Sequence, residues 1–139
     1  MVTNTPGSVA RQDPRQVSNT LRWHFNWNDP GLAAGVQIGV LPANAYIITN
    51  QLEIVTTFNG TTPLISVGTV ATAYNNIMGT ADNTATAASV YSPALAANKY
   101  GRGLTQAGDT PVFLKLAVTG SPSQGVGEYL LEFEGGFPG

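Results

Sequence analysis

The sequence predicts an all-β protein, an antiparallel β-sandwich of jelly-roll-like type with about seven or eight strands and an extended N-terminal arm. Three observations predict this fold. Apolar and polar residues alternate along several short segments, Gly, Pro and Asn separate these segments, and no segment spaces its apolar residues as a helix does. A parallel α/β fold is not expected, because its strands would be separated by helical patterns.

The composition limits the class of protein. The 139 residues suit one domain, and only 10% are charged, so Thr, Asn, Gln, Ser and Gly must cover most of the surface. A net charge of −2 offers no basic surface for nucleic acid, and no apolar run has signal-peptide or membrane-spanning length. Without cysteine the chain forms no disulfide and no thiolate metal site. We therefore expect neither nucleic acid nor a membrane as a partner.

Residues 1–19 are predicted to form an extended arm, and residues 20–139 a single sandwich domain. The first segment has no apolar period, contains two prolines, and places Arg11 and Arg15 around Asp13. It is either a loose chain end, as termini often are, or a tether that orders against a neighbouring subunit.

The expected strands follow in order along the rest of the chain. In the first, Trp23, Phe25 and Trp27 alternate with polar residues, and residues 28–31 then form a turn. The remaining segments with strand character are 36–40, 46–58, 63–70, one or two short strands around 85–91, 111–118 and 127–133. Residues 73–100 have weak periodicity and are expected to be mainly loops, with a short helical turn near 75–78.

The alternation also assigns faces to the strands. In segment 36–40, Val36, Ile38 and Val40 share one face. In segment 46–58 the even-numbered apolar residues are expected to face inward, with Asn50 interrupting that face. The inward residues expected in the three longest segments are Tyr46, Ile48, Leu52, Ile54, Phe58, Val112, Leu114, Leu116, Val118, Tyr129, Leu131 and Phe133.

Turn chemistry predicts one hairpin. Asn59 and Gly60 both tolerate the positive φ of a type I′ turn, so segments 46–58 and 63–70 are expected to pair. If the last two long strands also pair, Lys115 and Glu132 meet on their outer face.

The sequence shows no catalytic centre. His24, the single histidine, lies on the polar face of its strand without an orienting group or a nucleophile nearby. Glu132 and Glu134 share a face and could serve as an acid/base pair, but cross-strand pairing is the simpler explanation. Residues 101–103 begin like a phosphate loop, but no strand-to-helix context surrounds them. We expect no enzymatic activity, no metal site and no cofactor.

The aromatic residues allow two interpretations. Trp23, Trp27, Tyr74, Tyr91 and Tyr100 could form a platform for a sugar or a base. Because both tryptophans share the face of Phe25, entry into the core or a subunit contact is the simpler interpretation.

Apolar residues at positions expected to face outward are the positive functional signal. These are Ile47, Val55, Phe113 and Leu130, which, together with Arg11 and Arg15, are our candidate inter-subunit contacts. The alternative is that they are isolated surface residues, which are common.

One block of the sequence resembles tailed-phage head decoration, or cementing, proteins. Residues 47–70 contain a strand, the turn Thr56-Thr57-Phe58-Asn59-Gly60-Thr61-Thr62 and a return that ends in Val67-Gly68-Thr69. Those proteins commonly show a similar turn and return, and they end in a strand after a Gly-rich bend, as residues 112–133 do. The resemblance covers residues 45–133, although residues 71–76 lack the acidic cluster often found there.

The resemblance implies a structural virion protein that binds the outside of an icosahedral bacteriophage capsid and clamps adjacent major capsid subunits. It implies a homo-oligomer, a dimer or a trimer, that is assembled onto the head in the host cytoplasm. The alternative function is a carbohydrate- or receptor-binding β-sandwich module of a phage tail or fibre.

Overall fold

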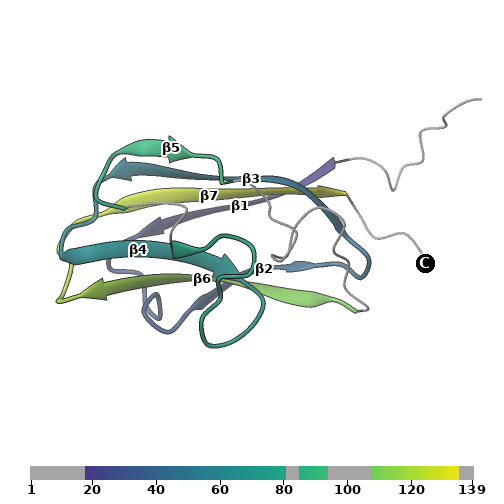
Figure 1. Cartoon of the computed structure of the whole chain (residues 1–139), viewed down its shortest axis with the longest axis horizontal. Helices are drawn as coiled ribbons and strands as arrows, with labels where there is room; N and C mark the ends of the chain where they lie inside the picture. Colours follow the sequence, from purple (N-terminus) through teal and green to yellow (C-terminus); the bar gives the residue numbers. More distant parts are fainter. Residues whose placement is uncertain (1–17, 81–84, 94–107, 135–139) are drawn as a thin grey trace, which may run out of the picture.

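The computed structural model describes residues 18–80, 85–93 and 108–134, which form two antiparallel sheets packed face to face (Figure 1). The four-stranded sheet has the order β1-β7-β3-β5, and the three-stranded sheet has the order β2-β6-β4. The strands are β1 (Ser18–Asn26), β2 (Val36–Leu41), β3 (Tyr46–Thr56), β4 (Thr61–Gly68), β5 (Ser89–Tyr91), β6 (Thr110–Thr119) and β7 (Val126–Glu134). The predicted antiparallel β-sandwich is confirmed, and β1 begins two residues before the predicted start of the domain.

Consecutive strands always lie in opposite sheets. Strand β1 pairs with β7, β2 with β6, and β3 with β5. The first half of the chain, up to β4, is therefore antiparallel to the second half. Rolling this long ribbon adds the pairings β3 with β7 and β4 with β6. A ribbon folded and rolled in this way is a jelly roll, here with seven strands in the part of the chain that the structure describes.

Because of this topology, the turns join sheets instead of forming hairpins. The hairpin predicted at Asn59 and Gly60 is wrong, because β3 and β4 lie in different sheets. The Asn59 carboxamide instead joins the β3–β4 connection to the β6–β7 connection. Its Oδ1 accepts hydrogen bonds from the N–H of Ser123 at 2.6 Å and of Gln124 at 3.2 Å. Its Nδ2 donates to Ser123 Oγ at 2.8 Å. The pair predicted between Lys115 and Glu132 is also wrong, since β6 and β7 lie in different sheets.

The core fills the space between the sheets. The predicted inward residues of β6 and β7 are confirmed there, with Val118 only partly buried. The largest fully buried side chains are Phe25, Leu41, Ile47, Leu52, Ile54, Phe58, Ile65, Ile77, Met78, Leu114, Tyr129 and Leu131. The predicted interruption at Asn50 is real: its fully buried Nδ2 donates to the hydroxyl of Tyr129 at 3.2 Å.

Two β-bulges in β3 explain where the predicted faces fail. The register against β7 shifts between Ile47 and Thr49 and again between Ile54 and Thr56. Each bulge adds a residue, which reverses the alternation beyond it. Ile47 is therefore fully buried, contrary to the prediction, whereas Tyr46 and Ile48 are only partly buried.

A bulge in β2 has the same effect. The register against β6 shifts between Gln37 and Gly39. Val40, predicted to lie on the face of Val36 and Ile38, is instead 45% exposed, while Leu41 is fully buried.

The segment after β4 folds back onto that strand. The predicted helical turn near residues 75–78 is wrong, because Met78 forms an isolated antiparallel bridge with Val67. Of the one or two short strands predicted around residues 85–91, the structure shows one, β5. Within the described ranges, no helix is long and apolar enough to cross a membrane.

Candidate interaction surfaces

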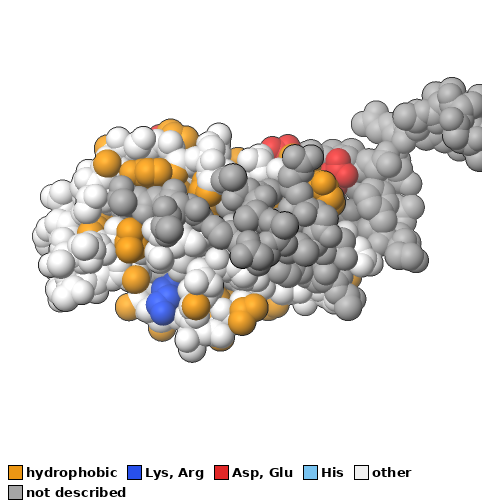
Figure 2. Space-filling view, viewed as in Figure 1, with side chains coloured by type: hydrophobic (Ala, Val, Ile, Leu, Met, Phe, Trp, Pro, Cys, Tyr) orange, Lys and Arg blue, Asp and Glu red, His pale blue; other side chains and the backbone are white. Residues whose placement is uncertain are grey.

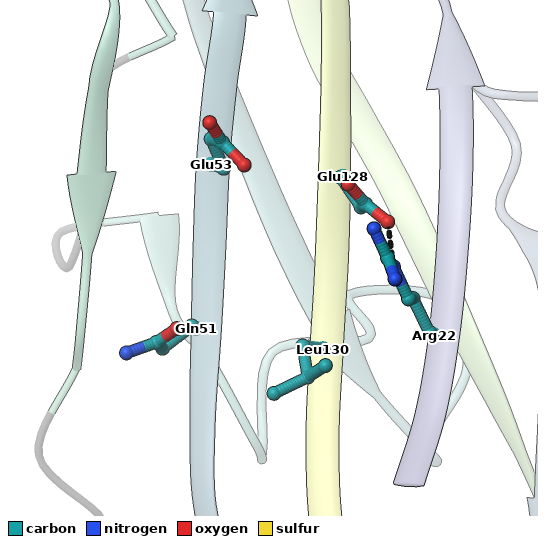
Figure 3. Close-up of a pocket in the computed structure, with 5 residues that line it drawn as sticks. All are labelled: Arg22, Gln51, Glu53, Glu128 and Leu130. Carbon is teal, nitrogen blue, oxygen red and sulfur yellow. Dashed lines mark hydrogen bonds and ion pairs between the residues drawn. The ribbon is translucent and has the colours of Figure 1, made fainter.

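The outer face of the four-stranded sheet carries most of the described charges. Glu53 of β3 and Glu128 of β7 are directly paired, and Arg22 of β1 binds Glu128 from the other side (Figure 3). Two adjacent carboxylates repel each other, so the guanidinium offsets a local excess of negative charge. The hydrogen bond and charge of Arg22 lower the pKa of Glu128, and the same contact raises the pKa of Arg22.

The surroundings of this ion pair form a shallow depression of about 130 Å³. It is lined by Arg22, Gln51, Glu53, Glu128 and Leu130 (Figure 3). Leu130, a predicted contact residue, does lie on the outer face, where it is partly buried between charged and amide side chains. The depression is shallow and highly charged, so it is suited to polar contacts more than to burial of an apolar ligand.

The acidic row of β7 continues toward the end of the strand. Glu132 is paired with Thr20 of β1 and Thr49 of β3, and Glu134 with Ser18 and Tyr46. No Lys or Arg is thus paired with either carboxylate in the described sheet. His24 is exposed on this face, opposite Glu128. Among the described residues, no group of three His, Asp or Glu could hold a metal ion.

Part of the outer face of the three-stranded sheet, around Ser66, Phe113 and Lys115, is covered by the chain itself. Tyr74 stacks on Phe113 with ring centroids 4.6 Å apart, Ser66 Oγ donates to Ala73 O at 3.2 Å, and Lys115 Nζ donates to Thr72 O at 3.1 Å. Phe113 therefore faces outward as predicted, but its ring is packed against a residue of its own chain. Its exposure to a second subunit is reduced accordingly.

The loop that covers this face is fixed by close packing. A Cβ on Gly68 would lie 2.2 Å from Oδ1 of Asn76 and 2.6 Å from the carbonyl carbon of Tyr74. Asn76 Oδ1 also accepts a hydrogen bond from the N–H of Thr69 at 2.7 Å, and its Nδ2 donates to Thr69 Oγ1 at 2.8 Å. Only glycine at position 68 leaves room for this arrangement.

An apolar patch lies on the outer face of the four-stranded sheet, near its β5 edge. Val55 and Val90 are 54% and 57% exposed, and both lie beside Glu53, Val55 two residues along β3 and Val90 opposite it on β5. In Figure 2, which looks onto the side of the sandwich, hydrophobic side chains gather in the region of β5 and β3. Val55 is thus exposed as predicted, whereas Val90 was not singled out from the sequence.

A groove near the β1–β2 connection was also not predicted. Trp27 is 39% exposed and lines a groove of about 420 Å³ with Leu32, Val118 and Pro122. Trp23, in contrast, packs against the core and stacks on Phe25 at 5.6 Å. Strand β1 ends at Asn26, so Trp27 leaves the alternation that would have taken it inward.

Several candidate residues lie outside the described residues. These are Arg11 and Arg15 of the predicted arm, Tyr100, and the glycine-rich segment 101–103. The four remaining candidates are separated in space: Ile47 is in the core, Val55 and Leu130 are on the four-stranded sheet, and Phe113 is on the three-stranded sheet.

Comparison with known proteins finds relatives only at the level of the fold. No protein-family model and no curated protein matches the sequence. The chain is similar to a chain of the acidic stable capsid structure of Helicobacter pylori bacteriophage KHP30, with TM-score 0.61 and 16% identity over 85% of this chain and 87% of that one. It is similar to a chain of the cyanophage Pam1 capsid asymmetric unit, with TM-score 0.60 and 15% identity over 96% and 97% of the two chains. A chain of the Ralstonia phage GP4 capsid gives TM-score 0.54 and 18% identity over 95% and 94%.

Proposed function

We propose that this protein is a structural component of a bacteriophage head, a decoration or cementing protein that binds the outside of the icosahedral shell. In this role it clamps adjacent major capsid subunits, acts as a homo-oligomer, and joins the head in the host cytoplasm. It catalyses no reaction and needs no cofactor. The observation that carries the proposal is the likeness in fold to chains of three phage capsid structures, over 85–96% of this chain.

The described surface supports a role in assembly. Uncharged loop residues cover part of the three-stranded sheet, and the single described cation of that sheet, Lys115, is bound to a backbone carbonyl. Weakly charged surfaces lose little solvation energy when they are buried against a partner. A decoration protein also binds in many copies, so each contact can be modest while the assembled layer is firmly held.

The patch of Val55 and Val90 is the part of the described surface best suited to contact the shell. Both side chains are more than half exposed, and they lie together on two adjacent strands. Burying an exposed valine at an interface contributes roughly 1 kcal/mol or more, because about 25 cal/mol is gained per Å² of apolar surface. We propose that this patch packs against the major capsid protein.

A binding experiment on particles tests the function. Heads of the phage that encodes this chain, stripped of the protein, are mixed with purified protein, sedimented and imaged by cryo-electron microscopy. The proposal expects co-sedimentation and ordered density on the outside of the shell. If the protein stays in the supernatant and is also missing from purified virions, it is not a decoration protein.

Matched variants test the contact surface separately. The double variant Val55→Asp/Val90→Asp should lose binding, whereas Val70→Asp, at a valine that is 63% exposed elsewhere, should keep it. If wild-type protein binds and both variants bind equally well, the function stands and the proposed patch is wrong.

The alternative, a carbohydrate- or receptor-binding module of a tail or fibre, finds less support in the described residues. Tyr74 is stacked on Phe113, and Trp23 and Tyr91 pack against the core, so these rings do not form an open platform. Among the Trp, Tyr and Phe side chains that the structure describes, Trp27 is the most exposed, at 39%. Binding on a glycan array that is lost in Trp27→Ala, without binding to heads, would favour this alternative.

A further inference from the structure

Strand β1 presents an open edge at one side of the four-stranded sheet. Among the described residues it pairs with β7 alone, without any register shift from Ser18 to Asn26. The N–H and C=O of Asn26 both bind Asp29, which places them on the side away from β7. By the alternation of an antiparallel ladder, Thr20, Arg22 and His24 direct their N–H and C=O groups to that same outer side.

The other three sheet edges are protected. β5 has only three residues. β2 is interrupted by its bulge at Gln37. β4 contains Pro63, and its Val67 is already bridged to Met78. Natural sandwiches block their edges by short strands, bulges, prolines and covering segments, since an open edge pairs with other chains. β1 is nine residues long, contains no proline and no register shift, and is covered by no other segment that the structure describes, so its edge is suited to accept a strand.

We propose that the edge of β1 binds residues 9–17 of a second copy of this chain, and that the two copies exchange these segments reciprocally. Residues 1–17 lead directly into the start of β1, at the edge itself. If the two-fold axis passes beside the junction of Val17 and Ser18, residues 9–17 of each copy run antiparallel along residues 18–26 of the other. Such an isologous contact closes into a dimer and joins the two four-stranded sheets.

The position of Pro14 supports this register. Residue 14 would lie opposite Leu21, whose backbone groups bond to β7, so the missing N–H of proline would face away from β1. Proline is tolerated on an edge strand in that orientation. A register shifted by one residue would instead place proline where its N–H is needed.

Charge supports the same register. Pro14 in this orientation places Arg11, Asp13 and Arg15 on the outer face of the sheet, the face of the β7 glutamates. Asp13 then lies opposite Arg22. Arg15 lies opposite Thr20, which is itself paired with Glu132. Arg15 thus brings a positive charge near Glu132, whose described cross-strand partners are both threonines. Arg11 lies opposite His24, next to Glu128.

The first test measures the mass of the full-length protein in solution by sedimentation equilibrium. We expect twice the chain mass of 14.5 kDa. Arg11→Pro removes an N–H that points at β1 and should give monomers, whereas Gln12→Pro removes one that points away and should leave the dimer. Arg11→Gln separates the loss of charge from the loss of the N–H. A monomer at every concentration, or a dimer indifferent to both prolines, overturns the proposal.

The second test exchanges charges. Arg15→Glu and Glu132→Arg should each weaken the dimer severalfold, and the double variant should restore it, because the pair is re-formed with opposite polarity. Amide hydrogen exchange should show Thr20 protected in the wild-type protein and exposed in Arg11→Pro. If the double variant is weaker than both single variants, these two residues do not meet. Binding to the shell is tested separately on particles, so failure of this pairing would remove the proposed dimer contact and leave the proposed binding to the capsid standing.

Discussion

Replacing the buried polar pair of Asn50 and Tyr129 tests how the core of this sandwich is held together. Both side chains are fully buried, and the single hydrogen bond between them runs from Asn50 Nδ2 to the tyrosine hydroxyl at 3.2 Å. Asn50 Oδ1 is buried without a hydrogen-bond partner in the described residues. Tyr129→Phe therefore leaves the whole carboxamide unsatisfied, and we expect a loss of about 1–3 kcal/mol in the free energy of unfolding.

The two remaining variants complete a cycle. Asn50→Leu leaves the hydroxyl unsatisfied, but it removes the unpartnered oxygen and adds apolar contact, so its loss should be smaller. The double variant Asn50→Leu/Tyr129→Phe removes both polar groups and should be close to wild type or more stable, because no buried polar atom is left unpaired. The expected coupling between the two sites is about 1–2 kcal/mol, as found for residues in direct contact.

Urea denaturation of full-length protein, all at one protein concentration, measures these differences as shifts of the midpoint. The matched control is Tyr46→Phe, since Tyr46 lies on the outer face of β3 and should change little. Losses of the two single variants that simply add in the double variant would refute the pairing.

The same tyrosine gives the stability a pH dependence. Burial raises the pKa of Tyr129 well above its ordinary value of 10.0, and the hydrogen bond from Asn50 opposes this only in part. Because the folded-state pKa lies above the unfolded one, the contribution is complete below pH about 10 and is lost as the pH rises toward the folded pKa. Wild-type protein should therefore lose stability above pH about 10 more steeply than Tyr129→Phe.

Two further predictions concern the surface and the corners. Asn59→Ala removes the carboxamide that joins two sheet-to-sheet connections and should cost about 1–2 kcal/mol in urea denaturation, whereas Ser123→Ala, which removes one of its partners, should cost less. Equal losses in the two variants would show that the hydrogen bonds from the N–H groups of Ser123 and Gln124 to Asn59 Oδ1 add no stability. The pKa of Glu128, followed by NMR, should lie below 4.5 and should rise in Arg22→Gln. The stabilisation from this ion pair is therefore complete above pH about 4.5 and is lost as the pH falls through the folded-state pKa. An unchanged pKa in the variant would show that Arg22 does not hold the carboxylate in solution.

Local alternation was enough to predict most of the strands and several of their faces. In β6 and β7 the register is regular along the inward residues, so Leu114, Tyr129 and Leu131 are buried as the pattern requires. Asn50 was predicted at an inward position and is there. Strand alternation depends on the backbone alone, which makes it readable from neighbouring residues.

The candidate contacts were harder to predict, because exposure depends on distant parts of the chain. Phe113 points outward from its strand, but Tyr74 covers it. Ile47 is buried because a bulge beside it reverses the alternation, and nothing in the local pattern marks the added residue. Val90 completes the patch with Val55 only because β5 pairs with β3.

The sequence by itself determined where the chain is extended, where it turns, and that its surface carries little charge. Only the tertiary structure decided which strands are neighbours. Asn59 and Gly60 do turn the chain, yet the turn leads into the opposite sheet. Arg22 reaches its partner Glu128 across 106 positions of sequence, and the same long-range pairing leaves β1 at the edge of the described sheet. Turn chemistry and alternation act over a few residues, whereas sheet order depends on burying both apolar faces in one core, which involves the whole chain at once.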